Sequence, residues 1–156
     1  MSEPQPLQFY EDLEVGTVET FGRTEVSRDE VIAFAARYDP QPFHLSDEAA
    51  AETFFGRLSA SGWHTAAMTM AMMVAHQQAQ GHQGSGSPGI DEMRFARPVY
   101  PGDVLTTRRT ILDKRRSASR PDLGIFRSRI ETLNQDGQVV LSFVGNAFVR
   151  VREGAA

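Results

Sequence analysis

The pattern of apolar and polar residues in the first part of the chain predicts a strand followed by a helix. After an irregular start over residues 1–16, the segment 17–26 is rich in Thr, Val and Phe, which favour strands. Residues 27–30 then match a helix-capping box, and apolar residues at helical spacing predict a helix over residues 28–37. That helix has to end near Tyr38, because the prolines that follow push the residues before them out of the helical region.

Two more helices are predicted before the chain changes to strands. Ser46 is followed by two carboxylates, a pattern typical of a helix start, and the helix that it begins ends before Gly56. The longest helical segment, residues 63–80, is rich in Ala and Met and has no Gly, no Pro and no acidic residue. A helix that is apolar around most of its circumference should be buried. Residues 81–89 contain four glycines and are expected to form a loop.

The rest of the chain predicts four consecutive strands. They are expected over residues 90–97, 104–116, 124–134 and 138–152. The Asp136-Gly137 pair between the last two is a strong hairpin signal. A strand, three helices and a run of four strands predict an α+β fold, in which an antiparallel sheet wraps around the helix 63–80 and buries it on most sides.

Composition narrows the class of protein further. A chain of 156 residues fits one domain, with an ordered core over about residues 8–150 and short tails. A net charge of −4 argues against a nucleic-acid partner, and the lack of cysteine excludes disulfides and thiolate chemistry. Residues 1–8 show no secretory signal, and no apolar run is long enough for a membrane span. We therefore expect a soluble, cytoplasmic protein.

Candidate chemistry concentrates in residues 38–44. Asp39 and His44 lie on a loop stiffened by Pro40 and Pro42, whose rings fix two φ angles at about −65°. A carboxylate and an imidazole that both hydrogen-bond one water can activate it as a nucleophile. An Asp before a Pro is also a common turn residue, and a lone His is often structural. The local chemistry by itself leaves both interpretations open.

The same segment carries a family signature. Asp39-x-Gln41-Pro42-x-His44 resembles the Asp-x-Asn-Pro-x-His signature of (R)-specific enoyl-CoA hydratases and MaoC-like dehydratases. Other segments resemble the same family, namely residues 54–56, 60–65, 86–95 and 97–103. The resemblance covers about residues 8–150.

This resemblance implies a hot-dog fold and the addition of water to a trans-2-enoyl thioester, or the reverse dehydration. It implies that Asp39 and His44 bind and activate the water, and that the Gly62 N–H polarises the thioester carbonyl. A helix N-terminus offers unpaired donors and a positive dipole end for that second task. The substrate would be an acyl-CoA or acyl-carrier-protein thioester, with coenzyme A only as part of the substrate and with no further cofactor and no metal. The family is usually dimeric, so we expect a homodimer or a higher assembly of dimers.

The chain departs from the family at two places. Gln41 replaces the Asn of the signature, and Ser61 replaces the more usual His before Gly62. Both departures leave the substrate class open. The residues expected to line the pocket are Gln41, Phe43, Ser61, Trp63 and His64.

Several other side chains suggest chemistry more weakly. Ser61 and His64 could pair as nucleophile and base, but no Gly-x-Ser-x-Gly elbow is present and Ser61 is better explained as a helix cap. His76 and His82 are expected to be surface or helix-end residues, and the four histidines do not have zinc-type spacing. A basic run could attract the phosphates of coenzyme A, although a solvated strand face explains it better. It comprises Arg108, Arg109, Lys114, Arg115, Arg116 and Arg120.

Two functions compete with hydration. Thioesterases share the hot-dog fold, and fold does not fix function. Many of them place a carboxylate on or beside the central helix, whereas no Asp or Glu occurs between Phe54 and Ile90. The other alternative is a non-catalytic acyl-CoA-binding module, in which Asp39 and His44 would have no effect on ligand affinity.

Overall fold

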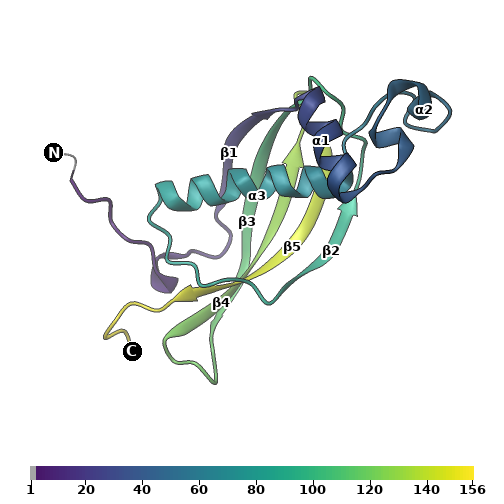
Figure 1. Ribbon diagram of the computed structural model, residues 1–156. Helices are drawn as coiled ribbons and strands as arrows, with labels where there is room; N and C mark the ends of the chain where they lie inside the picture. The colour runs from purple at the N-terminus through teal and green to yellow at the C-terminus, as the bar shows by residue number, and fades with distance from the viewer. Residues whose placement is uncertain (1–2) are drawn as a thin grey trace.

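A single antiparallel sheet curves around one long helix in the computed structural model, which describes residues 3–156 (Figure 1). The five strands pair in the order β1-β3-β4-β5-β2, and every pair is antiparallel. They are β1 (Val18–Glu25), β2 (Gly89–Phe95), β3 (Val104–Arg116), β4 (Leu123–Leu133) and β5 (Val139–Arg150). Helix α3 (Gly62–Ala79) lies along the concave side of this sheet. The arrangement confirms the predicted α+β hot-dog fold.

The shorter helices gather near the N-terminal end of α3 (Figure 1). They are α1 (Arg28–Tyr38), the single 3-10 turn η2 (Pro42–His44) and α2 (Asp47–Ala51). The Ser27 hydroxyl accepts a hydrogen bond from the Glu30 N–H, and that of Ser46 accepts one from the Ala49 N–H, so both predicted caps are confirmed. The start of the chain is irregular from residue 3 apart from the 3-10 turn η1 (Tyr10–Asp12), and Met1 and Ser2 lie outside the described residues. Across residues 3–156, no helix is long and apolar enough to cross a membrane.

The main core lies between α3 and the sheet. Met68 and Met72 of α3 are buried in one cluster with sheet residues such as Leu105, Ile130 and Leu141. Between the two methionines, the Thr69 hydroxyl hydrogen-bonds that of Thr132 on β4 at 2.6 Å. Both hydroxyls are buried, so their pairing avoids the cost of an unsatisfied polar group. The bond therefore fixes the position of α3 relative to the sheet.

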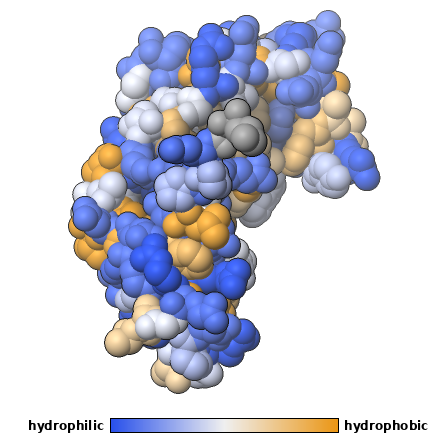
Figure 2. Space-filling model, turned by 90° about the vertical axis from the view of Figure 1, so that its left-hand side faces the viewer, coloured by the Kyte–Doolittle hydropathy of each residue, from blue (hydrophilic) through white to orange (hydrophobic). Residues whose placement is uncertain are grey.

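The prediction that α3 is buried on most sides is wrong for this chain. Trp63, Met70 and Val74 are 60%, 45% and 39% exposed, because the sheet covers only one side of the helix. Ile90 and Phe95 of the neighbouring edge strand β2 are also exposed, at 44% and 51%. We call these five residues the open face. By contrast, the side of the molecule toward the C-terminal end of α3 is mostly hydrophilic, with separate apolar patches (Figure 2).

A partly buried charged cluster ties β1, β3 and the end of α3 together. Arg109, only 2% exposed, forms an ion pair with Glu19, which also accepts a hydrogen bond from Gln80 at 2.8 Å. The prediction that Arg109 belongs to a solvated face is therefore wrong, because Glu19 neutralises its charge inside the fold. His76 lies in the last turn of α3, as a helix-end residue should, but its ring stacks on Phe21 with centroids 3.9 Å apart.

His82 is also more enclosed than a surface residue. Its Nδ1 lies 3.0 Å from the Gln8 side-chain oxygen, and its ring meets the Phe126 ring edge-on. Burial, followed by the positive charge of Arg109, lowers the pKa of His82 to about 4. The folded protein therefore favours the neutral ring, which helps to hold the start of the chain against the end of α3.

Acidification should weaken the fold through His82. The pKa of His82 falls from 6.5 to about 4 on folding, so the stability gained from the neutral ring is fully present above pH 6.5 and is lost as the pH falls through about 4. Urea unfolding at about pH 7.5 and about pH 5 should show a smaller loss on acidification for His82→Gln than for the wild type. Carboxylates titrate in both proteins, so their contribution to the loss of stability cancels in this comparison. Equal losses would contradict the role of His82.

Candidate active site

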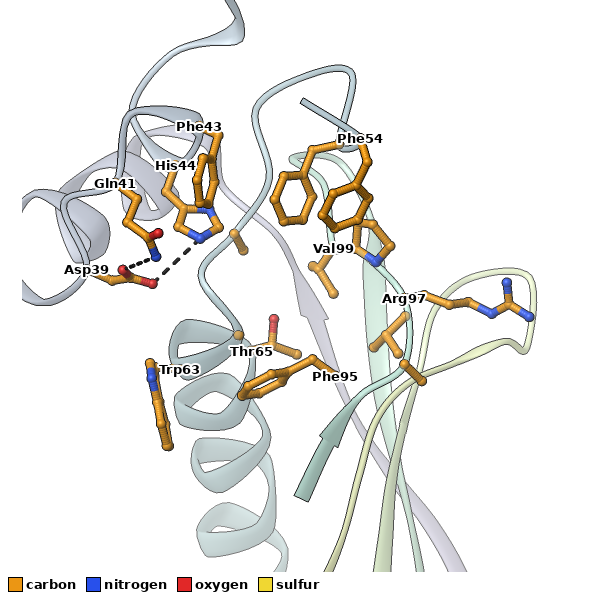
Figure 3. Close-up of a pocket in the computed structure, with 16 residues that line it drawn as sticks. Asp39, Gln41, Phe43, His44, Phe54, Trp63, Thr65, Phe95, Arg97 and Val99 are labelled. Carbon is orange, nitrogen blue, oxygen red and sulfur yellow. Dashed lines mark hydrogen bonds and ion pairs between the residues drawn. The ribbon is translucent and has the colours of Figure 1, made fainter. Parts of the chain in front are cut away.

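Asp39 and His44 meet where the end of α1 faces the start of α3 (Figure 3). Asp39 is the C-cap of α1, and its N–H donates to the Ala35 carbonyl, so the end of the helix fixes its backbone. His44 is the last residue of η2, the single turn that follows Gln41. The Asp39 Oδ2 and His44 Nε2 atoms are 3.6 Å apart. The short proline-containing loop thus brings both side chains to one point, as the sequence suggested.

A backbone carbonyl sets the tautomer of the His44 ring. His44 is only 5% exposed, and its Nδ1 lies 2.7 Å from the Ser59 carbonyl oxygen. A carbonyl oxygen can only accept, so Nδ1 carries the proton. In the neutral ring, Nε2 is then left with a lone pair on the side that faces Asp39.

Two side chains hold the Asp39 carboxylate. Gln41 Nε2 donates to Oδ1 and the Ser61 hydroxyl donates to Oδ2, both at 2.7 Å. Burial raises the pKa of Asp39, but the hydrogen bonds from Ser61 and Gln41 and the charge of His44 outweigh it and lower the pKa overall. When the Asp39 carboxylate is ionised and the His44 ring is neutral, Asp39 Oδ2 and His44 Nε2 are both acceptors. A water between them can donate one hydrogen to each and keep an oxygen lone pair free to attack a substrate.

The start of α3 provides a donor beside this pair. Ser61 caps the helix, because its hydroxyl accepts from the Trp63 N–H at 3.2 Å and its carbonyl accepts from the N–H groups of His64 and Thr65. Among residues 3–156, no acceptor is bonded to the Gly62 N–H. Gly62 lines the same cavity as Asp39 and His44. This N–H, at the positive end of a helix, can therefore receive a substrate carbonyl oxygen.

The pair opens into a largely apolar cavity of about 460 Å³. Besides Asp39, Gln41, His44 and Gly62, its wall consists mainly of aromatic and aliphatic side chains and includes Arg97. In Figure 3, Phe54 and Val99 lie across the cavity from Asp39, and the Arg97 guanidinium points away from it. Such a wall suits an acyl chain, while the polar groups sit together at one side.

The wall also contains a close contact between Gly62 and the edge strand. A Cβ atom at position 62 would lie 2.7 Å from two carbons of the Phe95 ring. Phe95 in turn meets the Trp63 ring edge-on, with centroids 5.9 Å apart. The ring therefore rests on the backbone at the first residue of α3, and a side chain at position 62 would require the Phe95 ring to move.

Three of the five predicted pocket residues, Gln41, Phe43 and Trp63, line the cavity. Ser61 does not line the cavity as predicted, because it is fully buried; its hydroxyl instead donates to Asp39. The prediction for His64 is wrong: its buried ring stacks on Phe34 of α1 with centroids 4.8 Å apart. One residue further along a helix turns the side chain by about 100°, from the cavity toward α1. Burial also lowers the pKa of His64.

Sequence reasoning missed the far wall of the cavity. Residues 95–99 and Val140 supply much of it. They adjoin because β2 pairs with β5, a long-range contact that no local motif announces. Within residues 3–156, no three His, Asp or Glu side chains are grouped as metal ligands would be, and the expectation of a reaction without metal stays a prediction.

Comparison with known proteins identifies the family. The family model described as MaoC like domain matches residues 14–129. A solved MaoC-like dehydratase from Rhodospirillum rubrum is 43% identical, with a TM-score of 0.83 over 93% of this chain and 98% of that chain. The uncharacterized protein YdeM of Bacillus subtilis is 31% identical over 125 residues, 80% of this chain and 86% of that protein.

A relative with a named reaction also matches. The 3-hydroxybutyryl-CoA dehydratase of Methylorubrum extorquens is 34% identical over 102 residues, which span 64% of this chain and 61% of that protein. The family model covers well over half of the chain, and the structural likeness covers nearly all of it. This chain therefore belongs to the MaoC-like domain family.

Proposed function

We propose that this protein adds water to trans-2-enoyl thioesters to form 3-hydroxyacyl thioesters, or catalyses the reverse dehydration. The observation that carries the proposal is the pairing of two acceptors, Asp39 Oδ2 and His44 Nε2, 3.6 Å apart at the wall of an acyl-sized cavity. Gly62, whose N–H has no acceptor in the described part of the chain, lines the same cavity. The named reaction of the Methylorubrum relative is of the same class.

Each of these groups has a distinct role in the proposed reaction. A water that donates to Asp39 and His44 attacks C3 of the enoyl group through its oxygen. As the new C–O bond forms, the electrons of the C2–C3 double bond move toward the thioester carbonyl, and the resulting enolate oxygen accepts a hydrogen bond from the Gly62 N–H. The proton lost by the water is held by the Asp39–His44 pair and is then returned to C2. Dehydration follows the same steps in reverse.

The substrate would be an acyl thioester of coenzyme A or of an acyl-carrier protein. The apolar cavity would hold the acyl chain, and no separate cofactor is needed for the steps above. The basic run on the sheet is a poor candidate for binding phosphates, because Arg108 and Arg120 form ion pairs with Glu131 and Asp122 and Arg109 is buried. Arg97, at the cavity wall, is better placed for that task. A cytoplasmic location stays a prediction.

Hydrolysis of the thioester is the main competing reaction. It is disfavoured because α3 carries no carboxylate that could act beside a bound thioester carbonyl. Simple acyl-CoA binding is disfavoured by the Asp39–His44 geometry, since an apolar binding module does not need a carboxylate held by two hydrogen bonds at the wall of its cavity.

In the presence of a chelator, the purified protein should convert a short trans-2-enoyl-CoA into a 3-hydroxyacyl-CoA. The reaction is measured as the loss of the enoyl absorbance. Asp39→Asn should lower the rate by about a hundredfold or more, the scale for a lost acid–base group. Asp113→Asn is the matched control, because Asp113 is exposed on β3 and pairs with Arg127 outside the cavity. Release of free thiol in place of hydration would show a thioesterase. Tight acyl-CoA binding without turnover, unchanged in Asp39→Asn and His44→Ala, would show a binding module.

We also infer that the open face is where two copies of the chain associate. Its five apolar residues lie along α3 and β2, and β2 is an edge strand with backbone groups free to pair. Exposed apolar surface next to an unpaired strand edge is typical of a protein–protein interface.

The wild-type protein should have the mass of a dimer, or of a multiple of dimers, by light scattering after size exclusion. Met70→Glu should shift it toward the monomer, because a charge would then be buried in the interface without a partner. Val18→Lys is the control, since Val18 is 58% exposed on the opposite edge strand β1. A monomeric wild type would contradict the interface.

A further inference from the structure

Ser61 contacts both the catalytic carboxylate and the helix that carries Gly62. It is 0% exposed, and its Oγ lies 2.7 Å from Asp39 Oδ2 and 3.2 Å from the Trp63 nitrogen. A backbone N–H can only donate, so the Ser61 oxygen accepts from Trp63. Its single proton is then directed at Asp39. The ionised Asp39 carboxylate can only accept, so Ser61 is the donor in this bond.

The bond leaves Asp39 little freedom to turn. Oδ1 accepts from Gln41 and Oδ2 accepts from Ser61, so rotation of the carboxylate would break both bonds. Oδ2 retains capacity for one more hydrogen bond, and His44 Nε2 is 3.6 Å away from it. Figure 3 shows the contacts of Asp39 with Gln41 and with His44 on the side that faces the cavity.

We propose that Ser61 is a positioning residue for Asp39, whose hydroxyl aims the free side of Oδ2 at the water site beside His44. The inference rests on the proposed hydration. Gly62, the next residue, supplies the N–H proposed for the substrate carbonyl. Ser61 therefore also fixes the distance between the water site and the carbonyl site. Small errors in such a separation are costly, because the reacting atoms must be held close to their productive geometry.

The competing explanation is that Ser61 only caps α3. Ser27 offers a matched comparison, because it caps α1 by the same kind of bond, to the Glu30 N–H, and is not among the donors to Asp39. Glycine is nearly as good a helix cap as serine but has no hydroxyl. Ser61→Gly therefore removes the bond to Asp39 with little damage to the helix, and Ser61→Ala removes both functions. Ser61→Thr keeps the hydroxyl.

The first measurement does not require activity. The Asp39 carboxyl carbon is followed by NMR as the pH is varied, and its signal is identified by its loss in Asp39→Asn. Removal of a hydrogen bond that favours the ionised form should raise the titration midpoint in Ser61→Gly and Ser61→Ala. Ser27→Ala should leave it unchanged, and Ser61→Thr should keep it near the wild-type value. An unchanged midpoint in Ser61→Gly would overturn the proposal even if the wild type is an active hydratase.

The second measurement is steady-state kinetics on an enoyl thioester that the wild type hydrates. Ser61→Gly should lower kcat by roughly tenfold or more, the scale for a hydrogen bond to a charged group, with KM little changed. Ser27→Ala should leave kcat near the wild-type value, and Ser61→Thr should restore most of it. If Ser61→Gly keeps the wild-type kcat, or loses no more than Ser27→Ala, Ser61 is only a cap and the proposal fails. An inactive wild type would instead refute the proposed function, and the NMR titration would still test the contact.

Discussion

The packing of α3 into the concave side of the sheet determines where the rest of the site can lie. Met68 and Met72 enter the main core, and the Thr69–Thr132 hydrogen bond fixes the helix along its length. The core side chains of α3 contact particular positions on the sheet. These contacts place the N-terminus of α3 beside the end of β2. The cavity is the space that remains between that helix start, the end of β2 and the loop after α1.

Residues 59–62 link the packing of α3 to the positions of the groups in the candidate site. The Ser59 carbonyl orients the His44 ring, the Ser61 hydroxyl holds Asp39, and Gly62 begins α3 with an N–H that bonds no acceptor within residues 3–156. Ser59 and Ser61 are fully buried, so this segment cannot shift without disturbing the core. Two side chains from a loop are thus held in place by buried neighbours, which is what the proposed water-activating pair requires.

Features set by neighbours in sequence could be predicted, and features set by long-range contacts could not. The caps at Ser27 and Ser46, the end of α1 near Tyr38 and the approach of Asp39 to His44 all follow from local rules. The open side of α3 could not be foreseen, because an apolar helix face looks the same in sequence whether a sheet or a second protein chain covers it. The burial of Arg109 depends on Glu19, ninety residues away in the chain. His64 was misplaced because its partner, Phe34, belongs to another helix.

The contact of Phe95 with Gly62 limits how this cavity can diversify. The ring occupies the space that a side chain at position 62 would need, so such a side chain would require the half-exposed Phe95 ring to move. A relative with a smaller residue at position 95 would have a wider entrance on the side of the open face and would tolerate a side chain at position 62. For the proposed acyl substrate, changes in specificity at this end of the cavity should therefore arise as paired substitutions at positions 62 and 95, which are separated in sequence by the rest of α3, the loop after it and β2.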